Sequence, residues 1–106
     1  MDVTNLESIP GKTIVRHLGL VQGSTVRAKH AGRDILAGLK NIVGGELKAY
    51  TELMQEARDE AVERMIAEAQ SMGANAVLNV RFATTSIAVG AAEILAYGSA
   101  VRLEDQ

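Results

Sequence analysis

The chain has 106 residues, enough for a single hydrophobic core, so we expect one domain spanning residues 1–106. Hydrophobic residues make up 47% and charged residues 23%, a balance that excludes an intrinsically disordered chain. The formal net charge of −2 excludes the strongly basic surface of a nucleic-acid-binding protein. No apolar run approaches the roughly 20 residues that cross a bilayer, so we expect neither nucleic acid nor membrane as a partner.

The chain contains no cysteine, which excludes disulfides, thiolate metal sites and a cysteine nucleophile. Its first residues, Met1 to Glu7, are polar and acidic, unlike the basic and then apolar pattern of a signal peptide. The sequence therefore predicts a cytoplasmic protein.

The first quarter of the chain reads as extended structure. Residues 1–9 predict a short lead-in strand that ends at the turn pair Pro10-Gly11. Residues 12–27 are rich in Val, Ile and Thr and predict one long strand, in which Gly19 and Gly23 favour a bulge or bend. A hairpin at Gln22-Gly23 is the alternative.

Two helices are predicted in the middle of the chain. Residues 33–43 place their aliphatic side chains on one helical face and end at Gly44-Gly45, which favours a helix C-terminus. A much longer helix is predicted from about Glu46 to Met72, followed by Gly73. Its apolar stripe comprises Tyr50, Met54, Ala57, Ala61, Met65, Ala69 and Met72.

The end of the chain predicts a β-hairpin. Residues 76–82 and 93–103 are strand-like and flank a loop of small residues around Val89-Gly90. The fold class is therefore α+β. We expect an antiparallel sheet of three to four strands packed on a long and a shorter helix, in the order β-β-α-α-β-β.

The predicted sheet has apolar residues on both sides. Ala76, Leu78, Val80 and Phe82 form one alternating row, which we place under the long helix. The final strand is largely apolar on both faces. Two helices cover only one face of a small sheet, so the second face predicts self-association into a homo-oligomer. A monomer with a modestly apolar outer face is the alternative.

Four polar residues are candidates for a ligand site. Asn79 and Arg81 share the mixed face of their strand, and they need partners if an assembly buries that face. Arg33 and Asp34 lie at the start of the shorter helix, where anions are attracted. These residues predict an anion or small-molecule site between subunits, and hydrogen bonds between subunits without a ligand are the alternative.

Metal-binding and catalytic signals are sparse. His17 and His30 match no metal-binding spacing, although His17 could supply one ligand per chain to a site shared between subunits. The carboxylates of the long helix are expected to be a solvated face, in which Glu60 pairs with Arg64. The sequence contains no GxGxxG, P-loop, GxSxG or HExxH motif, so no enzyme is predicted.

Several segments together resemble the YbjQ-like family of small bacterial and archaeal proteins, labelled "putative heavy-metal-binding". The segments are GRDI at 32–35, NIVGG at 41–45 and GANAV at 73–77, within a resemblance that covers about residues 9–101. The resemblance implies an α+β subunit, a ring-like homopentamer and, by its label, a metal ion as cofactor. Two positions depart from the family pattern: Asn79 replaces a small residue such as glycine, and Thr84-Thr85 replace an acidic and aromatic pair.

These observations favour a non-enzymatic homo-oligomer, pentameric by resemblance, that binds a small ligand or metal ion between its subunits. A structural or protein-interaction module is the alternative from a different functional class. An enzyme with an active site at the subunit boundary is the third hypothesis.

Overall fold

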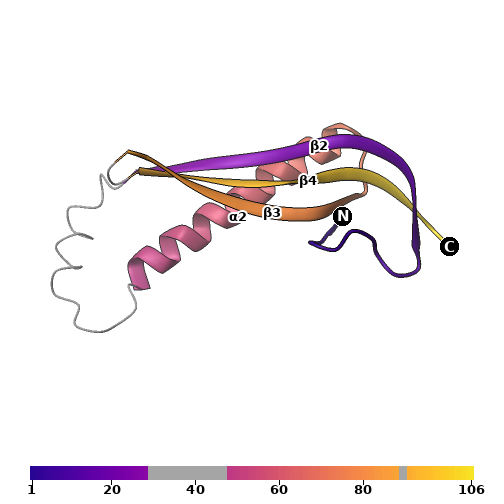
Figure 1. Cartoon of the computed structure of the whole chain (residues 1–106), viewed down its shortest axis with the longest axis horizontal. Coiled ribbons are helices and arrows are strands. Elements are labelled where there is room, and N and C mark those ends of the chain that lie inside the picture. Colours follow the sequence, from indigo (N-terminus) through magenta and orange to yellow (C-terminus); the bar gives the residue numbers. More distant parts are fainter. Residues whose placement is uncertain (29–47, 89–90) are drawn as a thin grey trace.

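The computed structural model describes residues 1–28, 48–88 and 91–106. The elements in chain order are β1 (Asp2–Val3), β2 (Lys12–Ala28), α2 (Lys48–Ser71), β3 (Ala76–Ala88) and β4 (Ala91–Asp105). The strands form one sheet in the order β1-β3-β4-β2, and α2 runs along one face of it (Figure 1). The predicted long helix and C-terminal hairpin are both confirmed.

The α+β class is confirmed, but the expectation of a purely antiparallel sheet is wrong. β1 pairs in parallel with β3, because the N-terminal segment runs beside β3 in the same direction. The shorter helix expected at 33–43, with Arg33 and Asp34, lies outside the described residues. The ring-like assembly stays a prediction, because the structure holds one chain. Within the described ranges, no helix is both long and apolar enough to span a membrane.

β2 is one continuous strand of 17 residues, as predicted. The alternative hairpin at Gln22-Gly23 is wrong, because these two residues pair in register with Tyr97 and Ala96 of β4. The pairing register shifts between Ile14 and Arg16 and again before Gly19, whose φ of 133° requires glycine. The irregularity predicted at Gly19 is therefore confirmed, whereas Gly23 pairs with Ala96 in regular register and forms no bulge.

β3 contains one extra residue at Asn79, where φ is 55°. Leu78 pairs with Ser99 and Arg81 with Tyr97, so three steps along β3 match two steps along β4. This bulge divides the row predicted to lie under the helix. Val80 packs in the cluster beneath α2, as predicted. Leu78 packs in a second cluster on the opposite face of the sheet, so its predicted position under the helix is wrong.

The core consequently has two parts of unequal size. The larger part lies between α2 and the sheet and consists of Val21, Ala57, Ala61, Met65, Ala69, Ala74, Val77, Val80, Ile94, Ala96 and Ala100. The smaller part lies on the far face, where Ile9 packs against Ala76, Leu78, Val101 and Leu103. The N-terminal segment therefore covers one end of the face that α2 does not cover.

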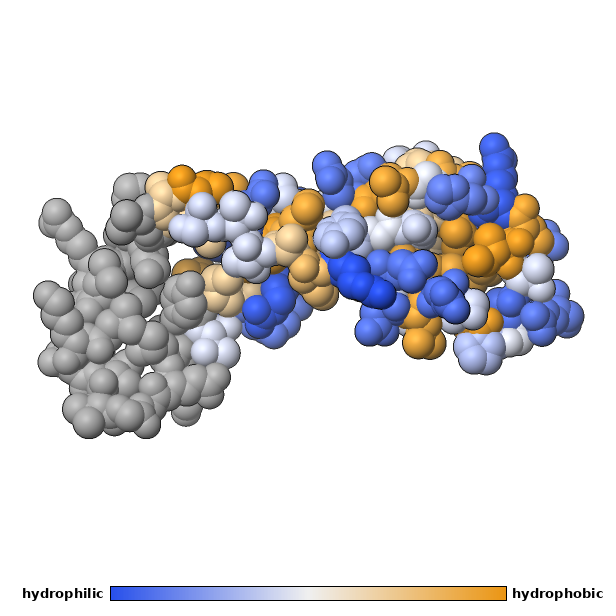
Figure 2. Space-filling model, viewed as in Figure 1, coloured by the Kyte–Doolittle hydropathy of each residue, from blue (hydrophilic) through white to orange (hydrophobic). Residues whose placement is uncertain are grey.

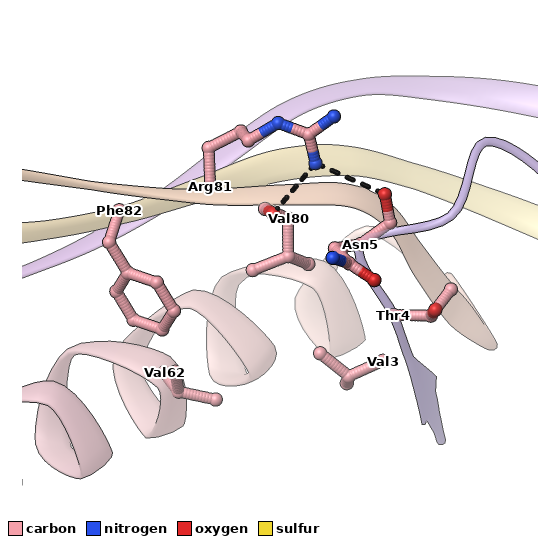
Figure 3. A pocket seen from close by; sticks show the side chains of 7 residues that line it. All are labelled: Val3, Thr4, Asn5, Val62, Val80, Arg81 and Phe82. Atoms are coloured by element: carbon pink, nitrogen blue, oxygen red, sulfur yellow. Dashed lines mark hydrogen bonds between the residues drawn. The ribbon is translucent and has the colours of Figure 1, made fainter.

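A graded row of side chains sets the spacing between α2 and the sheet. Gly23 of β2, Ala96 of β4 and Phe82 of β3 lie opposite one another, from the smallest residue to the largest. A Cβ atom at Gly23 would lie 2.2 Å from the carbonyl oxygen of Ala61 and 2.4 Å from the backbone nitrogen of Met65. The helix backbone therefore contacts β2 directly. On the β3 side, the ring of Phe82 points from the strand toward the helix (Figure 3).

Candidate functional site

The free edge of β2 is capped by side chains of α2. Arg64 Nη1 donates a hydrogen bond of 2.6 Å to the carbonyl oxygen of Ser24, and Gln22 N–H donates to Glu68 Oε2 at 3.5 Å. Glu60, Arg64 and Glu68 follow one another at intervals of four residues, which places them along one flank of the helix. This flank satisfies backbone groups that would otherwise be open to another strand.

Glu60 joins this flank to β2 through two arginines. Its Oε2 accepts a hydrogen bond from Arg27 Nη2 at 2.5 Å, and its Oε1 accepts one from Arg64 Nη2 at 2.5 Å. The hydrogen bond from Arg27 lowers the pKa of Glu60, and the charge of Arg64 adds to this effect against an opposing contribution from partial burial. The predicted Glu60–Arg64 pair is confirmed, and Arg27 is a partner that sequence reasoning missed.

The opposite flank of α2 borders an open cleft of about 460 Å³. Val3, Thr4, Asn5, Val62, Val80, Arg81 and Phe82 line it. Figure 3 shows Val80 and Phe82 pointing from β3 toward the helix, with Val62 below them on α2. The walls of the cleft are therefore mainly apolar, with polar groups from the N-terminal segment at one end.

Arg81 borders this cleft without reaching into it. Its Nη1 donates hydrogen bonds to the carbonyl oxygens of Asn5 at 3.1 Å and Val80 at 3.0 Å, and Figure 3 shows its side chain on the other side of β3 from Phe82. Asn79 is exposed at the bulge, and its backbone N–H donates to the carbonyl of Leu6. Both predicted site residues thus hold the N-terminal segment against β3.

A second cavity of about 440 Å³ lies beside β2 and β4. Leu20, Val21, Gln22, Glu68, Leu95 and Tyr97 line it. Two of these side chains are exposed, Leu20 at 77% and Tyr97 at 39%. Gln22, Tyr97 and Arg81 pair with one another across β2, β4 and β3. The second cavity therefore lies at the β2 end of this row, and the cleft lies at its β3 end.

The residues that the structure describes do not fit a heavy-metal site. His17 is exposed on β2, and no group of three or more His, Cys, Asp or Glu side chains gathers in residues 1–28, 48–88 and 91–106. The chain has no cysteine to offer as a soft ligand. His17 is therefore not part of a metal centre built from the described part of one chain.

Comparison with known proteins agrees with the resemblance seen in the sequence. A family model described as "Putative heavy-metal-binding" matches residues 1–104. A UPF0145 protein of Hahella chejuensis is 69% identical over 98% of this chain and 100% of its own length. A UPF0145 protein of Thermus thermophilus is 60% identical over 96% of this chain and 90% of its own.

The fold also occurs among solved structures. One example is a crystal structure of a protein of unknown function from Pediococcus pentosaceus, assigned to the DUF74 family, with a TM-score of 0.70. The match covers 98% of both chains at 16% sequence identity, so it bears on the fold alone. Together with the match of the family model to residues 1–104, the sequence relatives establish that this chain belongs to the YbjQ-like family.

Proposed function

We propose that this chain is a non-enzymatic, self-associating domain that binds a small organic molecule where its copies meet. The observation that carries the proposal is the exposed apolar surface on the sheet face away from α2. Leu20, Val26 and Tyr97 are exposed there at 77%, 53% and 39%. Figure 2 shows apolar residues at the surface of the described part of the chain, interspersed with hydrophilic ones. Such surface usually marks a contact with a partner.

The shape of the chain supports the same proposal. Its radius of gyration is 17.3 Å, whereas a compact chain of this length has a radius of about 13 Å. A long, thin subunit buries little of its own apolar surface, and association of copies reduces the exposed surface. The number of copies expected from the family resemblance is five.

The cavity beside Leu20, Leu95 and Tyr97 is the ligand site that fits this arrangement. It is open in a single chain, and a second copy on the far face would close it. Its wall would then combine apolar side chains with the polar groups of Gln22 and Glu68, the mixture that binds small organic ligands. An organic ligand suits these groups better than a heavy-metal ion, which prefers clustered thiolates and imidazoles.

Native mass spectrometry and light scattering test the assembly directly. The wild-type protein is expected to be oligomeric at micromolar concentration, and Leu20→Lys is expected to shift it toward smaller species, because it places a charge on the apolar face. Leu6→Lys is the matched control, since Leu6 is 55% exposed in the N-terminal segment. A wild-type protein that stays monomeric contradicts the proposal.

A second measurement separates an organic ligand from a metal ion. Denaturing the purified assembly and analysing the released small molecules by mass spectrometry should identify a compound that Leu20→Lys fails to retain. Titration with Zn²⁺, Cu²⁺, Ni²⁺ and Cd²⁺ is expected to show no stoichiometric uptake. Tight uptake of one of these ions by the wild type would replace the organic ligand with a metal.

A further inference from the structure

The cavity of about 440 Å³ beside β2 and β4 has a negative charge in its wall. Among the described residues that line it, Glu68 of α2 is the one with a charged side chain. The others are uncharged: Leu20, Val21, Gln22, Leu95 and Tyr97. A cavity with apolar walls and one carboxylate favours a ligand that carries a positive charge.

The charge of Glu68 is not neutralised within the chain. In the part of the protein that the structure describes, no ion pair includes Glu68. Arg64 lies one helical turn before it, but its guanidinium nitrogens donate to the carbonyl of Ser24 and to Glu60. The backbone N–H of Gln22 donates to Glu68 Oε2 at 3.5 Å, a long contact from a neutral donor. The carboxylate of Glu68 therefore lacks a counter-ion at the cavity.

Glu60 shows how the same helix flank holds a carboxylate that has a structural role. Both of its oxygens accept hydrogen bonds of 2.5 Å from guanidinium groups, one from Arg27 and one from Arg64. Glu68 lies two turns further along α2, is exposed, and has only the contact with Gln22 N–H. A neutral glutamine accepts such a hydrogen bond equally well, so the fold of one chain does not require the negative charge of Glu68.

The rest of the cavity suits an apolar body. Leu20 and Tyr97 are exposed, and Leu95 is half-buried. A molecule that lies against these side chains removes their apolar surface from water, which favours binding. The ring face of Tyr97 is also attractive to a cation. The volume of the cavity lies within the range of about 300–1,000 Å³ that is usual for small-molecule sites.

Building on the proposed function, we propose that the ligand of this cavity is an amine, with one cationic ammonium group on an apolar body. The ammonium group pairs with the carboxylate of Glu68, and the body packs against Leu20, Leu95 and Tyr97. A ligand with a carboxylate or phosphate group is disfavoured, because it would bring a second negative charge beside Glu68. A hard metal ion is disfavoured as well, because it requires more oxygen ligands than one carboxylate supplies.

Three probes with the same carbon chain test the charge of the ligand. Isothermal titration of the wild-type assembly with hexylamine, hexanol and hexanoate compares a cation, a neutral molecule and an anion. Hexylamine is expected to bind about fivefold or more tightly than hexanol, and hexanoate most weakly. The preference for hexylamine should shrink as the salt concentration rises, because ions screen the pair. Equal affinities, or tightest binding of hexanoate, would overturn the proposal.

A matched pair of variants assigns the preference to Glu68. Glu68→Gln keeps an acceptor for Gln22 N–H and removes the charge, so it should bind hexylamine no better than hexanol. Glu63→Gln makes the same change of charge at an exposed position of α2 that does not line the cavity, and it should keep the preference of the wild type. Loss of the preference in both variants, or in neither, would contradict the proposal.

Mass spectrometry of the compound released from the purified assembly separates this inference from the proposed function. An amine is expected, and Glu68→Gln should retain less of it than Glu63→Gln does. Release of a neutral or acidic compound by an oligomeric wild type would overturn the amine and leave the proposed function standing. A wild-type monomer in the native mass measurement would instead remove the proposed function, and this inference with it.

Discussion

The two flanks of α2 differ in how they meet the sheet. On the side of β2, the helix backbone contacts Gly23, the buried hydroxyl of Thr25 donates to the carbonyl of Ala57 at 3.0 Å, and charged side chains cap the strand edge. On the side of β3, Phe82 and Val62 border an open apolar cleft. One helix therefore has one closed flank and one open flank.

The two flanks contribute differently to the stability of a single chain. The closed flank satisfies its polar groups within the chain and leaves an incoming strand nothing to bind. The open flank leaves apolar side chains and backbone groups exposed, which adds little to the stability of one chain. Substitutions on the closed flank should therefore change the free energy of unfolding.

The largest effect is expected at Gly23, where the closed flank is tightest. Gly23→Val should lower the free energy of unfolding by about 3 kcal/mol or more, because its side chain would meet helix backbone atoms that cannot move independently. Urea denaturation measures this change. Ser24→Ala is the control, because it leaves the backbone carbonyl that binds Arg64 and should stay within about 0.5 kcal/mol of the wild type. A mild effect of Gly23→Val would show that the helix can shift away.

The next effect is expected at the bulge on the β3 side. Asn79→Val should cost about 1–2 kcal/mol, because a β-branched residue is strained at a φ of 55°. Asn79→Gly should differ from the wild type by less than about 0.5 kcal/mol, because glycine adopts this conformation readily. Thermal and urea denaturation of the pair provide the comparison. Equal stabilities would mean that the bulge is not retained in solution.

A smaller effect is expected when one cap of the β2 edge is removed. Arg64→Ala removes the hydrogen bonds to Ser24 and Glu60 and should cost about 1 kcal/mol, because the side chain is largely exposed. Arg58→Ala is matched to it on the same helix, where Arg58 contacts Gln55, and should cost less. The two free energies of unfolding from urea titrations should therefore rank in that order.

The smallest effect is a pH dependence of the same flank. The folded-state pKa of Glu60 lies below its ordinary value of 4.5, so its contribution to stability is present above that value. This contribution should be lost as the pH falls below 4.5 and through the lowered pKa. The difference in stability between wild type and Glu60→Gln should therefore shrink between pH 7 and pH 3. If the difference in stability grew as the pH falls, the ionised carboxylate of Glu60 would not be stabilising the folded state.

The elements with a strong periodic pattern could be predicted from the sequence. The long helix, the single strand β2 and the C-terminal hairpin all extend over many residues with consistent spacing, and all three are confirmed. β1 was anticipated as a strand, but its parallel partner was not. A strand of two residues carries too little pattern to specify a partner more than 70 residues away.

The candidate site was harder to predict because it depends on contacts between distant segments. Arg27 and Glu60 are 33 residues apart, and no local spacing connects them. The bulge did leave a sequence signal, since asparagine tolerates positive φ and stands here where relatives are expected to carry glycine. Asn79 is predicted as a ligand contact from its place beside Arg81 on the mixed face of the strand, and the change of face along β3 is not predicted. Arg33 and Asp34 lie outside the described residues, so their predicted role is untested.

The bulge also has a consequence for how this strand tolerates changes in length. β3 has one residue more between Leu78 and Arg81 than its pairing with β4 uses, and Asn79 is that surplus residue. A deletion of residue 79 would keep Val80 and Phe82 turned toward the helix, because the remaining residues alternate regularly. An insertion at the same place would leave two surplus residues opposite β4, so that β3 would need a larger bulge to keep Arg81 paired with Tyr97. Length variation at this point is therefore expected to be one-sided, with shortening accepted and lengthening rejected.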